Sequence, residues 1–239
     1  MIKKFACISA LAGLLFMSMA ANADTVNKSI RISDGATSDG ASSVNGSVTV
    51  GTGATVTGEV STVNGTIRIG SSAIVGEVST VNGSLRIDDG VQSDNLSTVN
   101  GSIRFGGNGS VNGTIEAVNG KISVGASSVV SGDVENVNGE IQLDGTQLQG
   151  GVGTVNGDIT VTNGSTVQGD IVIEKPSGWN FFRKTKRIPR ITIGPNSRVE
   201  GVIRAEREIK LFVHSSAEIG GVSGEVTMDK MVRFDGQRP

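Results

Sequence analysis

Arginine recurs at one position of a regular pattern in this chain, between two apolar residues. The arginines at this position are Arg31, Arg68, Arg86 and Arg104, and other polar residues replace them at Thr49, Ser123, Gln142 and Thr160. In a β-strand, a residue between two inward-facing neighbours points outward, so these side chains should form a column on one face. Guanidinium groups bind carboxylates and phosphates. Arg68, Arg86 and Arg104 are therefore candidate residues for binding an anionic ligand or polymer.

Acidic residues near these arginines in the sequence allow a second interpretation. They are Glu59, Glu77, Asp88 and Asp89. Surface ion pairs with these carboxylates would leave a solvated column without a ligand. The adjacent Asp88 and Asp89 also raise the question of a carbohydrate-cleaving site. Adjacent residues of a strand point to opposite faces, so this pair does not by itself supply an acid and a base.

A second group of candidate binding residues lies between positions 174 and 190, which read EKPSGWNFFRKTKRIPR. Aromatic side chains beside basic ones can insert into an anionic lipid surface, bind an acidic glycan or dock a partner protein. The alternative is a loop whose aromatic side chains cover the molecule while its basic residues stay in water. Both interpretations remain open. The candidate residues are Trp179, Phe181, Phe182, Arg183, Lys184, Lys186 and Arg187.

The chain contains few residues of the kinds that catalyse reactions. His214 is the single histidine, Cys7 is the single cysteine, and no nucleophile elbow, phosphate-binding loop or zinc pattern occurs. His214 follows an apolar run beside two serines, as expected for a surface histidine at a corner. We therefore predict a protein that is not an enzyme and that holds no metal and no cofactor.

These residues belong to a repeat that begins with Val-Asn-Gly, or with Val-Asn-Lys in its first copy. The copies start 18 or 19 residues apart, at Val26, Val44, Val63, Val81, Val99, Val118, Val137 and Val155. A fixed period of this length is typical of a solenoid, in which each copy is one turn that packs on its neighbours.

Within one copy, the apolar residues lie two or four positions apart, as in Val63, Ile67, Ile69, Ala73 and Val75. A gap of two is the period of a strand, and a gap of four lets the chain turn a corner. Three faces of about six residues fit one turn. The sequence therefore predicts an all-β fold, a three-sided parallel β-helix of about ten turns, with residues 174–190 inserted as a loop.

Asparagine-glycine pairs recur at the start of each copy and suit corners that require a positive φ. Equivalent asparagines of successive turns should lie above one another. We expect their amides to form a structural ladder of hydrogen bonds along the axis, as stacked amides do in other cross-strand arrays. The ladder residues are Asn45, Asn64, Asn82, Asn100, Asn119, Asn138 and Asn156, with Asn27 in the first copy.

Residues 1–23 have the features of a secretory signal peptide. Lys3 and Lys4 precede an apolar stretch, and small residues follow at Ala21-Asn22-Ala23. We predict a mature chain that begins at Asp24 and is exported, either to the periplasm or to the cell surface and beyond. Loss of the two lysines changes the 21 basic residues to 19 against 23 acidic ones, a net charge of −4. This balance gives no reason to expect nucleic acid as a partner.

The sequence divides the mature chain into a β-helix domain, residues 24–227, and a tail, residues 228–239. An uncapped β-helix exposes a turn of unpaired backbone groups. The first turn begins only three residues into the predicted mature chain, so we expect it to be open and to pair with another copy. The tail contains apolar residues among charged ones and should fold across the other end. A head-to-head dimer is the expected assembly.

The short strands in Ile67-Arg68-Ile69-Gly70, Ala73-Ile74-Val75-Gly76-Glu77-Val78 and Val81-Asn82-Gly83 resemble those of the bactofilins, the polymer-forming β-helical proteins of bacteria. The likeness covers most of residues 26–226. It implies a right-handed, three-sided helix that assembles through its ends and has a structural role without a nucleotide or cofactor. This chain differs from that family in its export signal, in the loop at 174–190 and in its short ends. A period of six residues per face also fits left-handed hexapeptide coils.

These observations predict an exported, non-enzymatic structural or scaffolding protein. It would associate with itself and contact envelope or surface components, such as lipid, glycan or protein, through the loop. The first alternative is a carbohydrate-binding or carbohydrate-cleaving protein that uses the arginine face. A third interpretation is an ice-binding or adhesive surface. Its basis is a threonine that recurs directly before the repeated corner, at Thr62, Thr80, Thr98 and Thr154.

Overall fold

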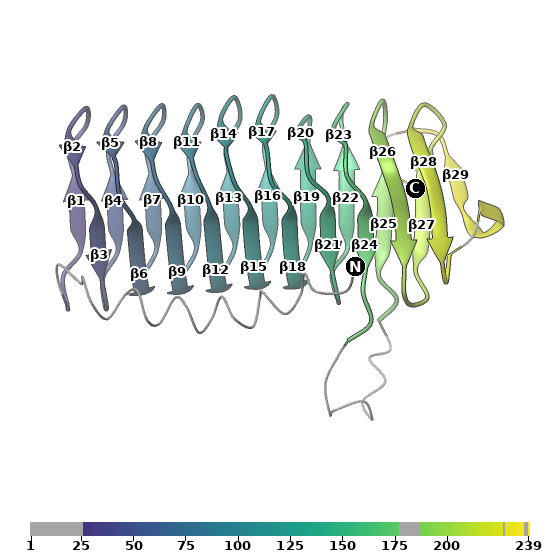
Figure 1. The fold of residues 1–239 in the computed structure, drawn as a ribbon, viewed down its shortest axis with the longest axis horizontal. Helices are drawn as coiled ribbons and strands as arrows, with labels where there is room; N and C mark the ends of the chain where they lie inside the picture. Colours follow the sequence, from purple (N-terminus) through teal and green to yellow (C-terminus); the bar gives the residue numbers. More distant parts are fainter. Residues whose placement is uncertain (1–25, 177–186, 227, 237–238) are drawn as a thin grey trace.

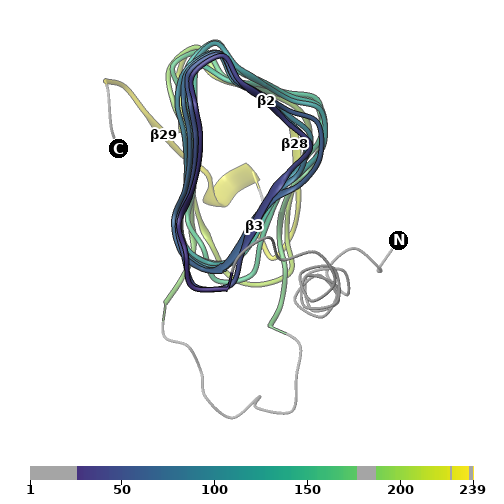
Figure 2. The ribbon, with the colours of Figure 1, turned by 90° about the vertical axis from the view of Figure 1, so that its left-hand side faces the viewer.

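The protein is a β-solenoid in which ten successive turns of chain are stacked along one axis (Figure 1). The computed structural model describes residues 26–176, 187–226, 228–236 and 239. Viewed along the axis, the coil has a triangular outline (Figure 2). No α-helix occurs in these described ranges. The predicted all-β, three-sided architecture is therefore confirmed, and about ten turns at one strand spacing each give a rod of roughly 48 Å.

Face 1 is an 11-stranded parallel sheet with one strand from each of the ten turns and a last strand, β29, after them. Ile67 pairs with Leu85, which in turn pairs with Ile103, so each strand is in register with the equivalent residues of the next turn. The strands are β1 (Ile30–Ile32), β4 (Val48–Val50), β7 (Ile67–Ile69), β10 (Leu85–Ile87), β13 (Ile103–Phe105), β16 (Ile122–Val124), β19 (Ile141–Asp144), β22 (Ile159–Thr162), β25 (Arg190–Ile193), β27 (Lys210–His214) and β29 (Val232–Phe234).

Face 2 consists of the two-residue strands that follow face 1 in each turn. They are β2 (Thr37–Ser38), β5 (Thr55–Val56), β8 (Ile74–Val75), β11 (Gln92–Ser93), β14 (Ser110–Val111), β17 (Val129–Val130), β20 (Gln147–Leu148) and β23 (Thr166–Val167). In the last two turns, the longer strands β26 (Arg198–Ala205) and β28 (Glu218–Gly224) continue around the corner onto face 3.

Face 3 completes each turn and leads into the asparagine corner. Its strands are β3 (Ala41–Ser43), β6 (Val60–Asn64), β9 (Val78–Asn82), β12 (Leu96–Asn100), β15 (Ile115–Asn119), β18 (Val134–Asn138), β21 (Val152–Thr154) and β24 (Ile171–Ile173). Ser79 pairs with Ser97, and Ser97 pairs with Glu116, again one turn apart. The outward side chains of this face therefore also form columns.

Apolar side chains from all three faces fill the interior in columns of Val, Ile, Leu and Ala. Ile67, Leu85 and Leu96 have no exposed surface, as the gaps of two and four in the sequence predict. Phe105 replaces the smaller residue of the neighbouring turns and is still 98% buried, because Gly109 leaves room for it. A Cβ at Gly109 would lie 2.7 Å from the Phe105 ring.

The prediction that the asparagine-glycine corners need a positive φ is wrong. Among the corner glycines that follow the ladder asparagines, only Gly139 has a positive φ, of 132°. Glycine is required there because the turns approach closely: a Cβ on Gly83 would lie 1.7 Å from the carbonyl oxygen of Gly65. Positive φ occurs instead at the corner between faces 1 and 2, for example at Ser72 (58°) and Gly90 (74°).

The two ends of the coil differ. At the C-terminal end, the short 3-10 helix η1 (Met228–Lys230) lies within the triangular outline (Figure 2). Met231 packs against the core, and β29 adds the last strand of face 1 although the sequence assigned it to the tail. At the other end, β1, β2 and β3 each pair with a strand of the second turn only, within the described residues.

Candidate functional site

The stacked asparagines form a continuous column of hydrogen bonds at the corner between faces 3 and 1. In each case, Nδ2 donates to Oδ1 of the asparagine one turn earlier, at 2.8–3.1 Å. The column runs from Asn27 to Asn156 and includes Asn45, Asn64, Asn82, Asn100, Asn119 and Asn138. Each of the eight asparagines is hydrogen-bonded to the asparagine of the adjacent turn, as the sequence predicts for a structural ladder.

Arg207 ends this ladder at the level of the inserted loop. Its Nη1 donates to Oδ1 of Asn156 at 3.0 Å, and its Nη2 donates to the backbone oxygen of Arg187 at 2.9 Å. Oδ1 of Asn156, the last asparagine of the ladder, therefore accepts its hydrogen bond from an arginine and not from another asparagine. The sequence pattern does not reveal this role, because Arg207 lies 51 residues from Asn156 and outside the repeat.

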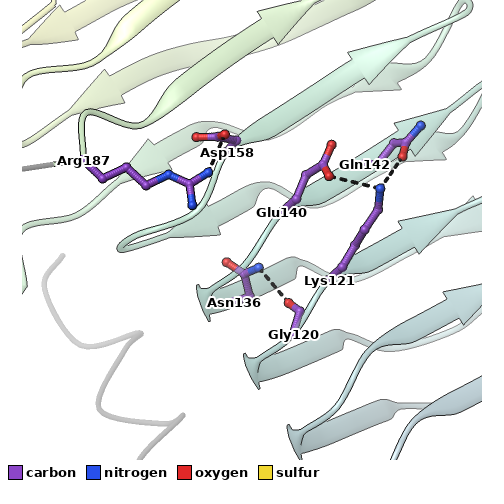
Figure 3. Close-up of polar contacts among 7 residues, drawn as sticks. All are labelled: Gly120, Lys121, Asn136, Glu140, Gln142, Asp158 and Arg187. Atoms are coloured by element: carbon purple, nitrogen blue, oxygen red, sulfur yellow. Dashed lines mark hydrogen bonds and ion pairs between the residues drawn. The ribbon is translucent and has the colours of Figure 1, made fainter.

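The threonines that precede the ladder asparagines face the interior and not the surface. Thr62, Thr80 and Thr154 have no exposed surface, and Thr98 is 98% buried. The hydroxyls of Thr62, Thr80 and Thr98 donate to corner glycine carbonyls of the preceding turn. In one turn the same position is Asn136, whose Nδ2 donates to the oxygen of Gly120 (Figure 3). Because these threonine side chains are buried, they cannot form an ice-binding surface.

The arginine column lies on the outside of face 1. Arg68 pairs with Arg86, and Arg86 pairs with Arg104, so the three occupy consecutive turns on β7, β10 and β13. All three are exposed, and none makes a hydrogen bond or an ion pair with another residue that the structure describes. One strand spacing of about 4.8 Å separates consecutive members. Three cations are thus held at short intervals without an ion pair to any described residue.

Of the acidic residues that could balance this column, Asp88 directly follows β10 and is exposed, and the others lie elsewhere. Glu59 and Glu77 directly precede β6 and β9 and belong to face 3. Oδ1 of Asp89 accepts a hydrogen bond from the backbone nitrogen of Gly107 at 2.8 Å, so this carboxylate holds a corner. Further along face 1, Lys121 binds Glu140 at 3.0 Å and Gln142 at 2.8 Å (Figure 3). The cation that follows the arginine column on this face is therefore paired.

Face 3 carries a second charged feature, which we call the acidic strip: Glu59, Glu77, Glu116 and Glu135. Glu116 and Glu135 pair on β15 and β18, and Ser97 lies next to Glu116 in the same outward column. Glu59 accepts a hydrogen bond from Ser79 at 2.9 Å. The sequence alone does not single out this strip, because the glutamates are separated by irregular intervals. They can be assigned to one surface only when the face to which each strand belongs is known.

The environments of two residues of the acidic strip, Glu77 and Glu116, favour protonation. Burial raises the pKa of Glu77, and repulsion by Glu59, Glu116 and Asp94 raises it further. Burial also raises the pKa of Glu116, although a hydrogen bond from Thr114 opposes the shift. The strip therefore concentrates negative charge around Glu77 and Glu116 in surroundings that disfavour it.

Two polar atoms of this surface have no partner among the described residues. Ser97 is 96% buried, and its Oγ makes no hydrogen bond. Oε2 of Glu116 is also buried without a partner, whereas its Oε1 accepts from Thr114 at 3.1 Å. Buried polar groups are almost always satisfied in folded proteins, so each exception needs an explanation. A hydrogen-bond donor supplied by a ligand or by a partner protein is one such explanation.

The inserted loop is tied to the coil at its base. Nη2 of Arg187 binds Oδ2 of Asp158 at 2.7 Å (Figure 3). The backbone nitrogen of Arg190 donates to Oδ1 of the same carboxylate at 3.0 Å. Arg187, a predicted ligand-binding residue, is thus engaged within the molecule. The other predicted loop residues lie outside the described residues; they are Trp179, Phe181, Phe182, Arg183, Lys184 and Lys186.

His214 lies at an exposed corner. Its Nδ1 accepts a hydrogen bond from the backbone nitrogen of Ser216 at 3.0 Å and is 2.8 Å from the hydroxyl of that serine. Its ring packs edge-on against Phe234 at 5.2 Å. These contacts connect the corner to the final strand β29.

Neither a metal cluster nor a membrane-spanning helix occurs in the described ranges. No group of three or more His, Cys, Asp or Glu side chains in these ranges could hold a metal ion. None of the helices in that part of the chain is long and apolar enough to cross a membrane. Comparisons with protein-family models, with curated proteins and with solved structures found no match to this chain.

Proposed function

We propose that this chain is an exported structural protein, similar to the bactofilins, that associates with itself through its first turn. The observation that carries the proposal is the difference between the two ends. The described C-terminal end is covered by η1 and Met231, whereas β1, β2 and β3 present an edge with no described partner strand. Such edges pair readily with other strands.

The open edge has specific unpaired groups. Ile30 donates its backbone N–H to Ser47, and the carbonyl of Ile32 accepts from Gly51, both in the second turn. Alternate residues of a strand direct their backbone groups to opposite sides, so the N–H and C=O of Arg31 point to the open edge. Two copies related by a twofold axis would bring two such edges together and close the assembly as a dimer.

Sedimentation velocity of the chain from Asp24, over a range of concentrations, tests this proposal. Arg31→Pro removes the outward N–H, and proline is tolerated where an edge strand faces solvent. We expect it to weaken association by about 10-fold or more, since two symmetry-related hydrogen bonds are lost. Arg31→Ala is the matched control, because it removes the same side chain and keeps the N–H. A strict monomer for the unaltered chain would overturn the proposal.

A second candidate function is binding of an acidic polysaccharide by the arginine column. It is favoured by three exposed guanidinium groups in consecutive turns with no ion pair to any described residue. Polygalacturonate is a suitable probe, and the triple substitution of Arg68, Arg86 and Arg104 by glutamate should abolish binding. Arg31→Glu is the control, because Thr49 separates Arg31 from the column. Equal binding by both variants would exclude this candidate.

Contact between the loop and the cell envelope remains a proposal based on the sequence. Its supports are the three aromatic residues beside a basic run and the attachment of the loop base through Arg187 and Asp158. The test is flotation with vesicles of phosphatidylglycerol, with phosphatidylcholine vesicles as the neutral control. Substitution of Trp179, Phe181 and Phe182 by serine should prevent flotation with the anionic vesicles. Unchanged flotation would remove lipid as the partner of the loop.

A further inference from the structure

We propose that two copies of this chain also associate side by side, with the arginine column of one copy against the acidic strip of its neighbour. This inference rests on the proposed self-association and adds a second, lateral interface to it. The two surfaces lie on different faces of the same turns: Arg68, Arg86 and Arg104 on face 1, and Glu59, Glu77, Glu116 and Glu135 on face 3.

The axial spacing of the two surfaces matches because one solenoid produces both. Consecutive arginines are one turn apart, and so are Ser97, Glu116 and Glu135. Arg68 and Glu77 belong to one turn, and Arg104 and Glu116 to another. Two parallel copies without stagger therefore place each arginine at the height of the strip, with Ser97 opposite the middle arginine.

The unsatisfied atoms support the choice of occupant. Oε2 of Glu116 is an acceptor without a donor, and Oγ of Ser97 is 96% buried without a partner among the described residues. A guanidinium group offers five N–H donors in a planar arrangement that suits a carboxylate and a neighbouring oxygen. The three arginines make no hydrogen bond or ion pair with another described residue. The arginine column can therefore supply the donors that Oε2 of Glu116 and Oγ of Ser97 lack among the described residues.

The arrangement of the faces also explains why the arginine column and the acidic strip of one copy cannot bind each other. The two surfaces lie on different sides of the triangular coil (Figure 2), and the asparagine corner separates them. A contact between unlike surfaces is heterologous, so a copy that has bound one neighbour still presents one free surface of each kind. Lateral association then continues until the copies close a ring or form an extended array.

A charge-swap experiment tests the interface, in an Arg31→Pro background that blocks pairing through the first turn. One variant carries Arg68→Glu, Arg86→Glu and Arg104→Glu, and the other carries Glu59→Lys, Glu77→Lys and Glu116→Lys. Each alone should sediment as a monomer, because its two surfaces now have like charge. Mixed in equal amounts, they should form mixed oligomers, because acidic and basic surfaces are again available. Raising the salt concentration to about 0.5 M should dissociate them.

Two controls keep this experiment decisive. Thr37→Glu, Gln92→Glu and Gln147→Glu add charge at exposed positions of face 2 and should leave lateral association unchanged. If a charge-reversal variant does not fold, as judged by circular dichroism, substitution of the same three arginines by glutamine is used instead and should weaken association about 10-fold or more. The corresponding glutamate-to-glutamine triple should have the same effect.

The outcomes for the two interfaces are separate. If the mixture stays monomeric while the Arg31→Ala chain still associates, the lateral interface is excluded and end pairing is kept. If Arg31→Pro associates as well as Arg31→Ala and the mixture assembles, end pairing is excluded and the lateral interface is kept. Binding of polygalacturonate by the arginine column without any mixed assembly assigns the column to a glycan and overturns the lateral interface.

Discussion

At the scale of single residues, the molecule depends on side chains that repeat the same contact in every turn. Each inner asparagine of the ladder donates one hydrogen bond and accepts another, whereas Asn27 only accepts one from the ladder. Aligned amides of this kind polarise one another, so each bond strengthens its neighbours. The effect of a substitution should therefore depend on its place in the column.

Asn82→Ala removes the hydrogen bonds to Asn64 and Asn100. We expect the free energy of unfolding to fall by about 1–3 kcal/mol, at about 1 kcal/mol for each bond. Urea denaturation followed by circular dichroism measures the change. Asn27→Ala removes one bond at the end of the ladder and should cost about half as much. An equal loss for both substitutions would show that the cost does not follow the number of ladder hydrogen bonds removed.

Glu116 should make stability depend on pH in a direction opposite to that of an ordinary surface carboxylate. Its folded pKa lies above the unfolded value of 4.5, mainly because it is buried. The folded chain therefore binds more protons, and stability falls as the pH rises through the folded pKa. This contribution is fully present below pH 4.5.

Glu116→Gln tests this dependence. At pH 7 the substitution should raise the free energy of unfolding by less than about 1 kcal/mol, because water screens a partly exposed carboxylate. The gain should disappear near pH 4, where the glutamate is protonated in both states. Denaturation curves at the two pH values measure it. A gain of the same size at both would assign the effect to packing and not to charge.

At the scale of elements, the two kinds of corner have different requirements. At the asparagine corner, the carbonyl of one turn occupies the space that a Cβ of the next would need, as at Gly83. At the corner between faces 1 and 2, Gly53 has a φ of 65°, and no atom lies within 4 Å of the position that a Cβ would take. At Gly83 a side chain is excluded by contact with the neighbouring turn, whereas at Gly53 it is disfavoured only by the backbone conformation.

Gly83→Ala and Gly53→Ala distinguish these causes. We expect Gly53→Ala to lower the free energy of unfolding by about 1 kcal/mol, the cost of a left-handed conformation. Gly83→Ala should cost several times more, because the corner at Gly65, between β6 and β7, and the corner at Gly83, between β9 and β10, must move apart to admit the methyl group. Thermal unfolding by calorimetry compares the two. Similar melting temperatures would show that the asparagine corner can expand.

Much of this architecture could be predicted from the sequence because each turn repeats the same pattern. The spacing of residues such as Ile67, Ile69 and Val75 predicts the strands and their inward sides, and the recurring asparagines predict the ladder. Whether the side chain of Thr62 points inward or outward could not be predicted in the same way. It depends on the direction in which the chain bends at the corner. The acidic strip could not be predicted from the sequence, because Glu77 precedes its strand, whereas Glu116 lies within one.

At the scale of the whole molecule, register is preserved from turn to turn because equivalent residues pair directly. Ile67 on β7 pairs with Leu85 on β10, which pairs with Ile103 on β13. Deletion of residues 67–84 would therefore join residue 66 to Leu85 and remove one complete turn. We expect a folded, cooperative protein shorter by about 4.8 Å, measured by small-angle X-ray scattering. Deletion of residues 67–75 removes half a turn and should prevent folding.

The equal height of the turns has a consequence for how such a protein can change over time. Genetic exchange between neighbouring copies of the repeat adds or removes whole turns, and the strand pairing across the new junction has the same register as the pairing between the other turns. Its length can therefore vary in equal increments while both ends and the inserted loop keep their own contacts. If partners bind at the ends, the number of copies in the gene sets the distance between them.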